Sequence, residues 1–132
     1  MSSESRHPPH RLGARGERLA THRLEAAGWR VVARNYRLGR REVDLIVRRG
    51  DTLAFVEVKT RAGPGFGPPE ASVTWRKRAE IEMVARDYLM RNHARDSLEV
   101  RFDVVAIEVG VRGEVERYEH IEDAWRPETP GR

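Results

Sequence analysis

The chain contains no cysteine, which excludes disulfide bonds and zinc sites built on thiolates and is compatible with a reducing compartment. It also contains no apolar run approaching the roughly 18 residues of a membrane span. Its first residues lack the apolar core of a signal peptide. We therefore expect a cytoplasmic protein that makes no membrane contact.

Lysine is nearly absent as well. Of the 25 basic residues, only Lys59 and Lys77 are lysines, so the chain uses arginine almost wherever it needs a cation. The bias itself reflects the genome. A lysine in this background indicates a position where a compact, rotatable ammonium is needed and a planar guanidinium does not serve.

What the chain does have fits one charged globular domain. It is 132 residues long, with 39% hydrophobic and 35% charged residues. A net charge of +4 favours polyanionic partners, with DNA the first candidate and RNA not excluded. We expect a flexible tail over residues 1–11, a single α/β domain over 12–125 and a frayed C-terminal tail over 126–132.

Periodicity and turn residues predict an order of elements. The expected elements are a helix at 12–27, strands at 29–36, 41–47 and 53–59, a Gly/Pro-rich loop at 61–69, a helix at 72–92, a strand at 100–109 and a short edge strand at 115–118. The strand-helix-strand crossover predicts that the strand at 100–109 lies parallel to the strand at 53–59. The expected fold is therefore α/β, with a mixed central sheet flanked by helices.

The strands at 41–47 and 53–59 carry the most informative residues. Gly50 and Asp51 between them suit a two-residue hairpin loop, in which paired positions sum to 101. Asp44 then lies opposite Glu57, and Glu42 lies opposite Lys59. A period of two puts all four side chains on one face of the sheet.

Facing carboxylates repel and weaken a sheet, so something is expected to compensate for Asp44 and Glu57. Mg²⁺, or Mn²⁺ in its place, does so directly, because it needs only one or two protein carboxylates and leaves positions for water and phosphate. Lys59 beside them is suited to steadying an attacking water or the charge at phosphorus. The alternative is a solvated outer sheet face on which Lys59 pairs with Glu42.

A second group of residues suggests contact with nucleic acid. Trp75, Arg76, Lys77 and Arg78 occupy the first turns of the second expected helix. Basic residues at that end oppose the helix dipole, which points to another benefit, such as phosphate contact with base stacking on Trp75. The alternative is a solvated basic face with Trp75 packed on the sheet. Arg41 and Arg61 add positive charge close to the acidic pair.

The order helix, three-strand meander, helix, strand resembles the core of the PD-(D/E)xK, or restriction-endonuclease-like, nuclease superfamily. Within it the chain looks like the YraN family of small, largely uncharacterised bacterial proteins, over residues 12–125. The matching segments are Gly13-x-x-Gly16-Glu17, Glu42-Val43-Asp44-Leu45-Ile46, Phe55-Val56-Glu57-Val58-Lys59-x-Arg61, Ser72-Val73-Thr74 and Arg101-Phe102-Asp103-Val104-Val105.

The resemblance implies that Asp44 and Glu57 are metal ligands and that Lys59 is the catalytic lysine. Glu17 would be an acid of the first helix that completes or orients the metal shell, or else a surface acid paired with a neighbouring arginine. The chain departs from the family pattern at Arg41, where glycine is usual before Glu42.

The leading hypothesis is an endonuclease-like protein that uses Mg²⁺ or Mn²⁺ and a metal-activated water to hydrolyse phosphodiester bonds in DNA. The alternative is a non-catalytic nucleic-acid-binding accessory protein in recombination, repair or DNA uptake, and a scaffold for another protein is a third possibility. A homodimer formed through the edge strand at 115–118 stays open.

Overall fold

The structure is a computed structural model that describes residues 9–63, 67–92 and 98–128. Residues 1–8 and 129–132, which hold most of the two expected tails, lie outside the described residues, as does the tip of the Gly/Pro-rich loop. The elements are α1 (Pro9–Ala26), β1 (Arg30–Leu38), β2 (Arg41–Arg49), β3 (Thr52–Ala62), the 3-10 helix η2 (Pro69–Ser72), α2 (Trp75–Arg91), β4 (Glu99–Val109) and β5 (Val115–Trp125).

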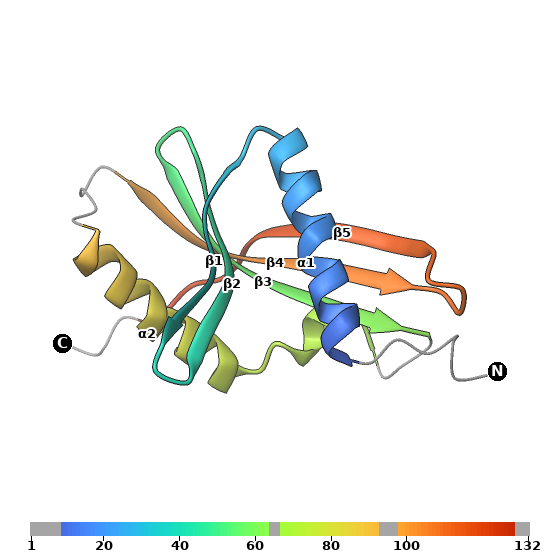
Figure 1. Cartoon of the computed structure of the whole chain (residues 1–132). Helices are drawn as coiled ribbons and strands as arrows, with labels where there is room; N and C mark the ends of the chain where they lie inside the picture. The colour runs from blue at the N-terminus through green and yellow to red at the C-terminus, as the bar shows by residue number, and fades with distance from the viewer. Residues whose placement is uncertain (1–8, 64–66, 93–97, 129–132) are drawn as a thin grey trace.

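The strands form one mixed sheet in the order β1-β2-β3-β4-β5 (Figure 1). The first three strands are antiparallel, β4 runs parallel to β3, and β5 returns antiparallel to β4. The α/β fold class, the meander and the parallel crossover strand predicted from the sequence are therefore confirmed.

Each helix covers its own cluster of core side chains, and Figure 1 shows α1 in blue and α2 in yellow at separate places on the sheet. The alternation of buried residues along β3 explains this. Ala54 and Val56 join the cluster that holds Ala20 and Leu24 of α1. Phe55 joins the cluster that holds Ile81 and Val84 of α2. The sheet is therefore buried on both sides, as expected for a strand paired in parallel.

Several boundaries differ from the sequence prediction. The first helix begins at Pro9, three residues before the expected start. The second begins only at Trp75, where Thr74 is the N-cap and its hydroxyl accepts a hydrogen bond from the Lys77 amide at 3.2 Å. The preceding residues form η2 instead. None of the helices among the described residues combines the length and apolarity that crossing a bilayer requires.

Two strands are longer than predicted because each gains pairing from β4. The last residues of β3 continue the parallel ladder as far as Ala62↔Val109, inside the segment expected to be loop. The strand expected at 115–118 runs eleven residues, to Trp125, which pairs with Phe102. β5 lies at the edge of the sheet as predicted, but the prediction that it is short was wrong.

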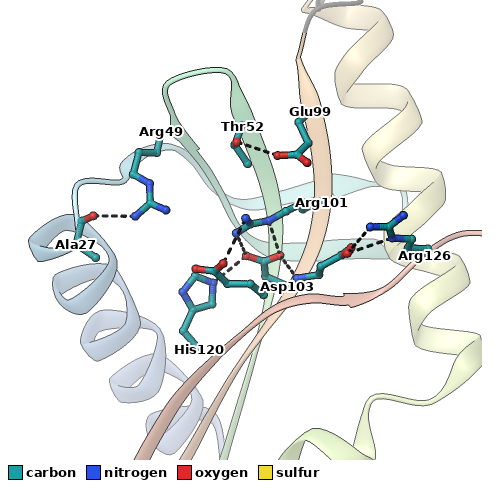
Figure 2. Close-up of polar contacts among 10 residues, drawn as sticks. Ala27, Arg49, Thr52, Glu99, Arg101, Asp103, His120 and Arg126 are labelled. Carbon is teal, nitrogen blue, oxygen red and sulfur yellow. Dashed lines mark hydrogen bonds and ion pairs between the residues drawn. The ribbon is translucent and has the colours of Figure 1, made fainter.

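A buried carboxylate, Asp103, fastens β4 to β5 (Figure 2). Its two oxygens accept hydrogen bonds from the Arg101 guanidinium at 2.8 Å and from the Asp123 amide at 2.9 Å, and its contact with His120 Nε2 is 2.8 Å. Burial alone would raise the pKa of Asp103, but these partners hold it below the usual value. Both carboxylate oxygens of Asp103 thus have hydrogen-bond partners within the protein.

Candidate functional site

The hairpin of β2 and β3 has the predicted register only over part of its length. Pairs from Arg49↔Thr52 to Leu45↔Val56 follow the expected sum of 101. Within residues 41–62, all of which are described, the ladder ends there, so Asp44 and Glu57 are not a ladder pair. β2 meanwhile stays paired with β1 as far as Arg41↔Leu38. β2 and β3, which carry the acidic residues, are therefore no longer paired by a backbone ladder at Asp44 and Glu57.

The Asp44 carboxylate replaces the missing backbone partner. Its Oδ2 accepts a hydrogen bond from the Val58 amide at 2.7 Å, a short distance typical of a charged acceptor. The burial pattern changes at the same point, because Val43 belongs to the core cluster under α2 with Ile46. Leu45 belongs to the cluster under α1. Asp44 thus lies where the ladder between β2 and β3 has ended, and its side chain bonds to β3 instead.

Glu57 is the most perturbed acid of the site. It is 4% exposed, and its Oε1 has no hydrogen-bond partner in the part of the chain that the structure describes. Burial raises the pKa of Glu57 to about 8, and the charge of Asp44 raises it further within that total. A buried carboxylate with an unfilled acceptor is costly to the fold, which contrasts with the fully bonded Asp103.

Glu17 of α1 belongs to the same electrostatic group. Burial, followed by the charges of Asp44 and Glu42, raises the pKa of Glu17 to about 7. A hydrogen bond with Asn35 opposes that rise. Glu17 and Asn35 line a hollow of about 190 Å³ between α1 and β1. The role of Glu17 as an acid near the metal ligands stays a prediction, and among the described residues Glu17 makes no ion pair with an arginine.

Both lysines of the chain act on Glu57. Lys59 Nζ lies 3.8 Å from Glu57 Oε2. The ammonium of Lys77 lowers the pKa of Glu57 more strongly than that of Lys59 does. Lys77 Nζ also donates to the backbone oxygen of Glu42 at 3.3 Å, which ties the start of α2 to β2. Lys77 was predicted only as a nucleic-acid contact, and the scarcity of lysine was the sequence signal that marks both residues.

The expected pairing of Glu42 with Lys59 is wrong. Glu42 forms an ion pair with Arg37 at 3.2 Å, because Arg37 is its partner on β1. Lys59 is left to Glu57 alone among the described acids. The alternative of a solvated, mutually neutralised sheet face consequently does not describe these residues.

The residues after Lys59 contain further polar atoms with no hydrogen-bond partner among the described residues: Thr60 Oγ1 and Arg61 Nε. The hydrogen bonds from Arg117 are the main cause of the lowered pKa of Glu70 in η2, and the charge of Arg61 adds to that effect. Thr60 faces α1, where Gly16 packs so closely that an added Cβ would lie 1.9 Å from Thr60 Oγ1. Gly16 is therefore what lets α1, and Glu17 with it, approach β3.

The donor set of this site suits a hard cation such as Mg²⁺. Asp44 and Glu57 supply carboxylate oxygens, one of them, Glu57 Oε1, still unpartnered. Within the described residues no group of three or more His, Cys, Asp and Glu side chains is arranged to hold a metal ion. Two carboxylates nevertheless suffice for Mg²⁺, which keeps several waters and binds substrate oxygens. The residues therefore fit a two-carboxylate site and not a closed protein cage.

The predicted nucleic-acid contacts lie near this site with different surroundings. Arg41, Trp75 and Arg76 are exposed. Trp75 is 79% exposed and therefore is not packed on the sheet. Arg78 has structural partners, since its Nε donates to the Val73 oxygen at 3.2 Å and its guanidinium lies 5.3 Å from the centre of the Trp125 ring.

A protein-family model described as "Uncharacterised protein family UPF0102" matches residues 16–107. A UPF0102 protein of Rhodococcus jostii is 48% identical over 114 residues, which cover 86% of this chain and 95% of that protein. A UPF0102 protein of Chlorobium phaeobacteroides is 41% identical over 132 residues, covering 97% of this chain and all of its own. The matched segment contains every acid and both lysines of the candidate site.

Proposed function

Since this chain belongs to the uncharacterised protein family UPF0102, whose description names no activity, we propose a function from its own candidate site: Mg²⁺-dependent hydrolysis of phosphodiester bonds in DNA. The chain would act as an endonuclease, with Mn²⁺ as an alternative metal. The likeness of its motifs to the PD-(D/E)xK nucleases supports this proposal.

One observation carries the proposal, namely that Glu57 is buried without a full set of partners. The other deeply buried carboxylate, Asp103, is bonded on both oxygens and has a lowered pKa. Glu57 has an unpartnered Oε1 and a raised pKa beside Asp44 and Glu17. Such an arrangement destabilises the fold when no cation is bound and is expected where a cation binds.

The side chains divide the chemistry between them. Asp44 and Glu57 would hold Mg²⁺, which supplies water activation and neutralises charge on the phosphate. Lys59, half-buried and next to Glu57, is placed to steady the charge that develops on the phosphate oxygens as the new bond to water forms and the bond to the leaving oxygen breaks. Lys77 adds a second cation from α2 while holding β2 in place.

The first test is cleavage. Purified protein with Mg²⁺ or Mn²⁺ should cut at least one of linear, flapped and branched DNA, and chelation with EDTA should stop it. Asp44→Asn and Lys59→Ala, purified in parallel, should lose most of the activity. Arg40→Ala serves as the matched control, because Arg40 is an exposed cation in the β1–β2 turn.

The second test measures the cation alone by titration calorimetry. Wild type should bind Mg²⁺ or Mn²⁺, and Asp44→Asn should bind it far more weakly. Absence of binding in wild type, or equal cleavage by wild type and Lys59→Ala, would refute the proposal.

The exposed Trp75 and Arg76 favour a second candidate, a nucleic-acid-binding accessory protein without catalysis. It predicts binding that weakens steeply with salt and no cleavage under any metal condition. The two candidates therefore separate on the cleavage assay alone.

A further inference from the structure

A groove of about 360 Å³ lies between the first turns of α2 and the end of β5. Its walls come from one stripe of α2, spaced three or four residues apart, and from the chain at and after Trp125. The lining residues are Trp75, Arg78, Ala79, Glu82, Trp125, Arg126 and Glu128. All of them lie outside the set of acids and lysines that form the candidate metal site.

One wall of this groove is rigid. The Trp125 indole stacks on Phe102 with ring centres 5.2 Å apart and donates to Glu82 Oε2 at 2.9 Å. The Arg78 guanidinium lies over the Trp125 ring. Glu82, one of the two acids of the groove, is thus already engaged by the indole N–H.

The other wall is an exposed aromatic ring. Trp29 and Trp125 are 3% and 8% exposed, whereas Trp75 is 79% exposed at the first position of α2. Leaving a large apolar ring in water forgoes the stabilisation that burial would give. Arginines line the same groove, and Arg126 is 83% exposed despite its contact with Asp123. An aromatic face among cations is the combination that binds single-stranded nucleic acid.

The groove and the candidate site share one helical turn. Trp75 and Arg78 face the groove, while Lys77 between them reaches the Glu42 oxygen on β2. A chain bound in the groove would therefore lie within one helical turn of Lys77. Within a duplex the faces of the bases are covered by their neighbours, so stacking on Trp75 without disrupting the duplex favours an unpaired base.

We propose that this groove binds an unpaired nucleobase by stacking on Trp75, with its backbone phosphate near Arg78 and Arg126, so that the substrate contains a single-stranded segment next to the cut. The proposal rests on the proposed nuclease function for the substrate class. The stacking contact itself does not require catalysis, so the two can fail separately.

Binding in EDTA tests the groove without cleavage. Fluorescence anisotropy with a dye-labelled oligodeoxythymidine, a matching oligouridine and a blunt duplex compares wild type with Trp75→Ala and Trp75→Phe. Met90→Ala is the control, because Met90 is 78% exposed on the same helix but outside the groove. Loss of one stacked base should weaken single-strand binding roughly 5- to 150-fold in Trp75→Ala. Phenylalanine should retain most of the affinity, while Met90→Ala and the duplex should show no change.

Equal single-strand affinity of wild type and Trp75→Ala would overturn the groove assignment, as would a preference of wild type for the duplex. Self-association that depends on Trp75, seen by sedimentation, would give the groove to a second copy of the chain and overturn it too. Cleavage that is indifferent to Trp75 would refute the groove alone. Trp75-dependent binding without metal-dependent cleavage would support the groove and refute hydrolysis.

Discussion

Glu57→Gln should make the unfolding free energy of the metal-free protein less dependent on pH. Below about pH 4.5 the Glu57 carboxyl is protonated in both the folded and the unfolded chain. As the pH rises, the unfolded chain releases its proton first, while burial keeps the folded carboxyl protonated up to about pH 8. The wild type therefore loses stability across this window, and glutamine, which does not titrate, removes that loss.

The size of the effect follows from the same two values. Each pH unit between them changes the unfolding free energy by about 1.4 kcal/mol, so the interval from 4.5 to about 8 gives an upper limit of about 5 kcal/mol. At pH 8 without metal, Glu57→Gln should therefore be more stable than wild type. Mg²⁺ at 100 times its dissociation constant should narrow this difference by about 2.7 kcal/mol, because the ligand stabilises only the protein that binds it.

Urea unfolding followed by circular dichroism in EDTA, at several pH values between 4.5 and 8.5, measures this dependence. Glu25→Gln is the matched control, because Glu25 is an exposed acid of α1, and its curve should run parallel to that of wild type. Parallel curves for wild type and Glu57→Gln would refute the reasoning, since they would mean that Glu57 ionises normally in the fold.

Three further changes test other parts of the molecule. Lys77→Ala should raise the pKa of Glu57, because the Lys77 ammonium lowers it, whereas Arg76→Ala should leave it unchanged. Carbon-13 NMR titration of the glutamate carboxyls measures the pKa of Glu57 in both variants. Equal pKa values in the two variants would contradict the placement of Lys77. Gly16→Ala should destabilise the fold by about 1–3 kcal/mol through its clash with Thr60, while Gly13→Ala, with nothing within 4 Å, should stabilise α1 by about 0.5–1 kcal/mol in the same urea assay. Asp103→Ala should cost about 3–5 kcal/mol, because it leaves the largely buried Arg101 with only the more exposed Glu122 as an ion-pair partner, and a loss under about 1 kcal/mol would count against that network.

Local patterns were sufficient to predict most of the sheet. The Gly50-Asp51 turn set the register of the hairpin correctly from Arg49↔Thr52 to Leu45↔Val56. The crossover rule gave the parallel pairing of β4 with β3. Both depend on residues close in sequence or on the general handedness of chains, so a single sequence contains the information.

The predictions that failed concern contacts that depend on residues distant in the sequence. Turn geometry does not reveal that the Asp44 side chain accepts a hydrogen bond from the Val58 amide where the ladder between β2 and β3 ends. The pairing of Glu42 with Arg37 depends on β1, which lies on the other side of β2. The length of β5 was hidden because its residues show no regular alternation of buried and exposed positions. To predict that Lys77 lies close enough to lower the pKa of Glu57, one would need the path of the whole β3–α2–β4 crossover.

The hydrogen bond from the Val58 amide to Asp44 Oδ2 gives one carboxylate two roles, because the side chain that joins β2 to β3 is also a proposed metal ligand. Substitutions at this position should separate the two. Asparagine can keep the acceptor for the Val58 amide and lose only the charge, whereas alanine also leaves that amide unbonded. If Asp44 holds a cation as proposed, the Val58 amide is bonded directly to a ligand of that cation, so amide exchange at Val58 should change when the cation binds.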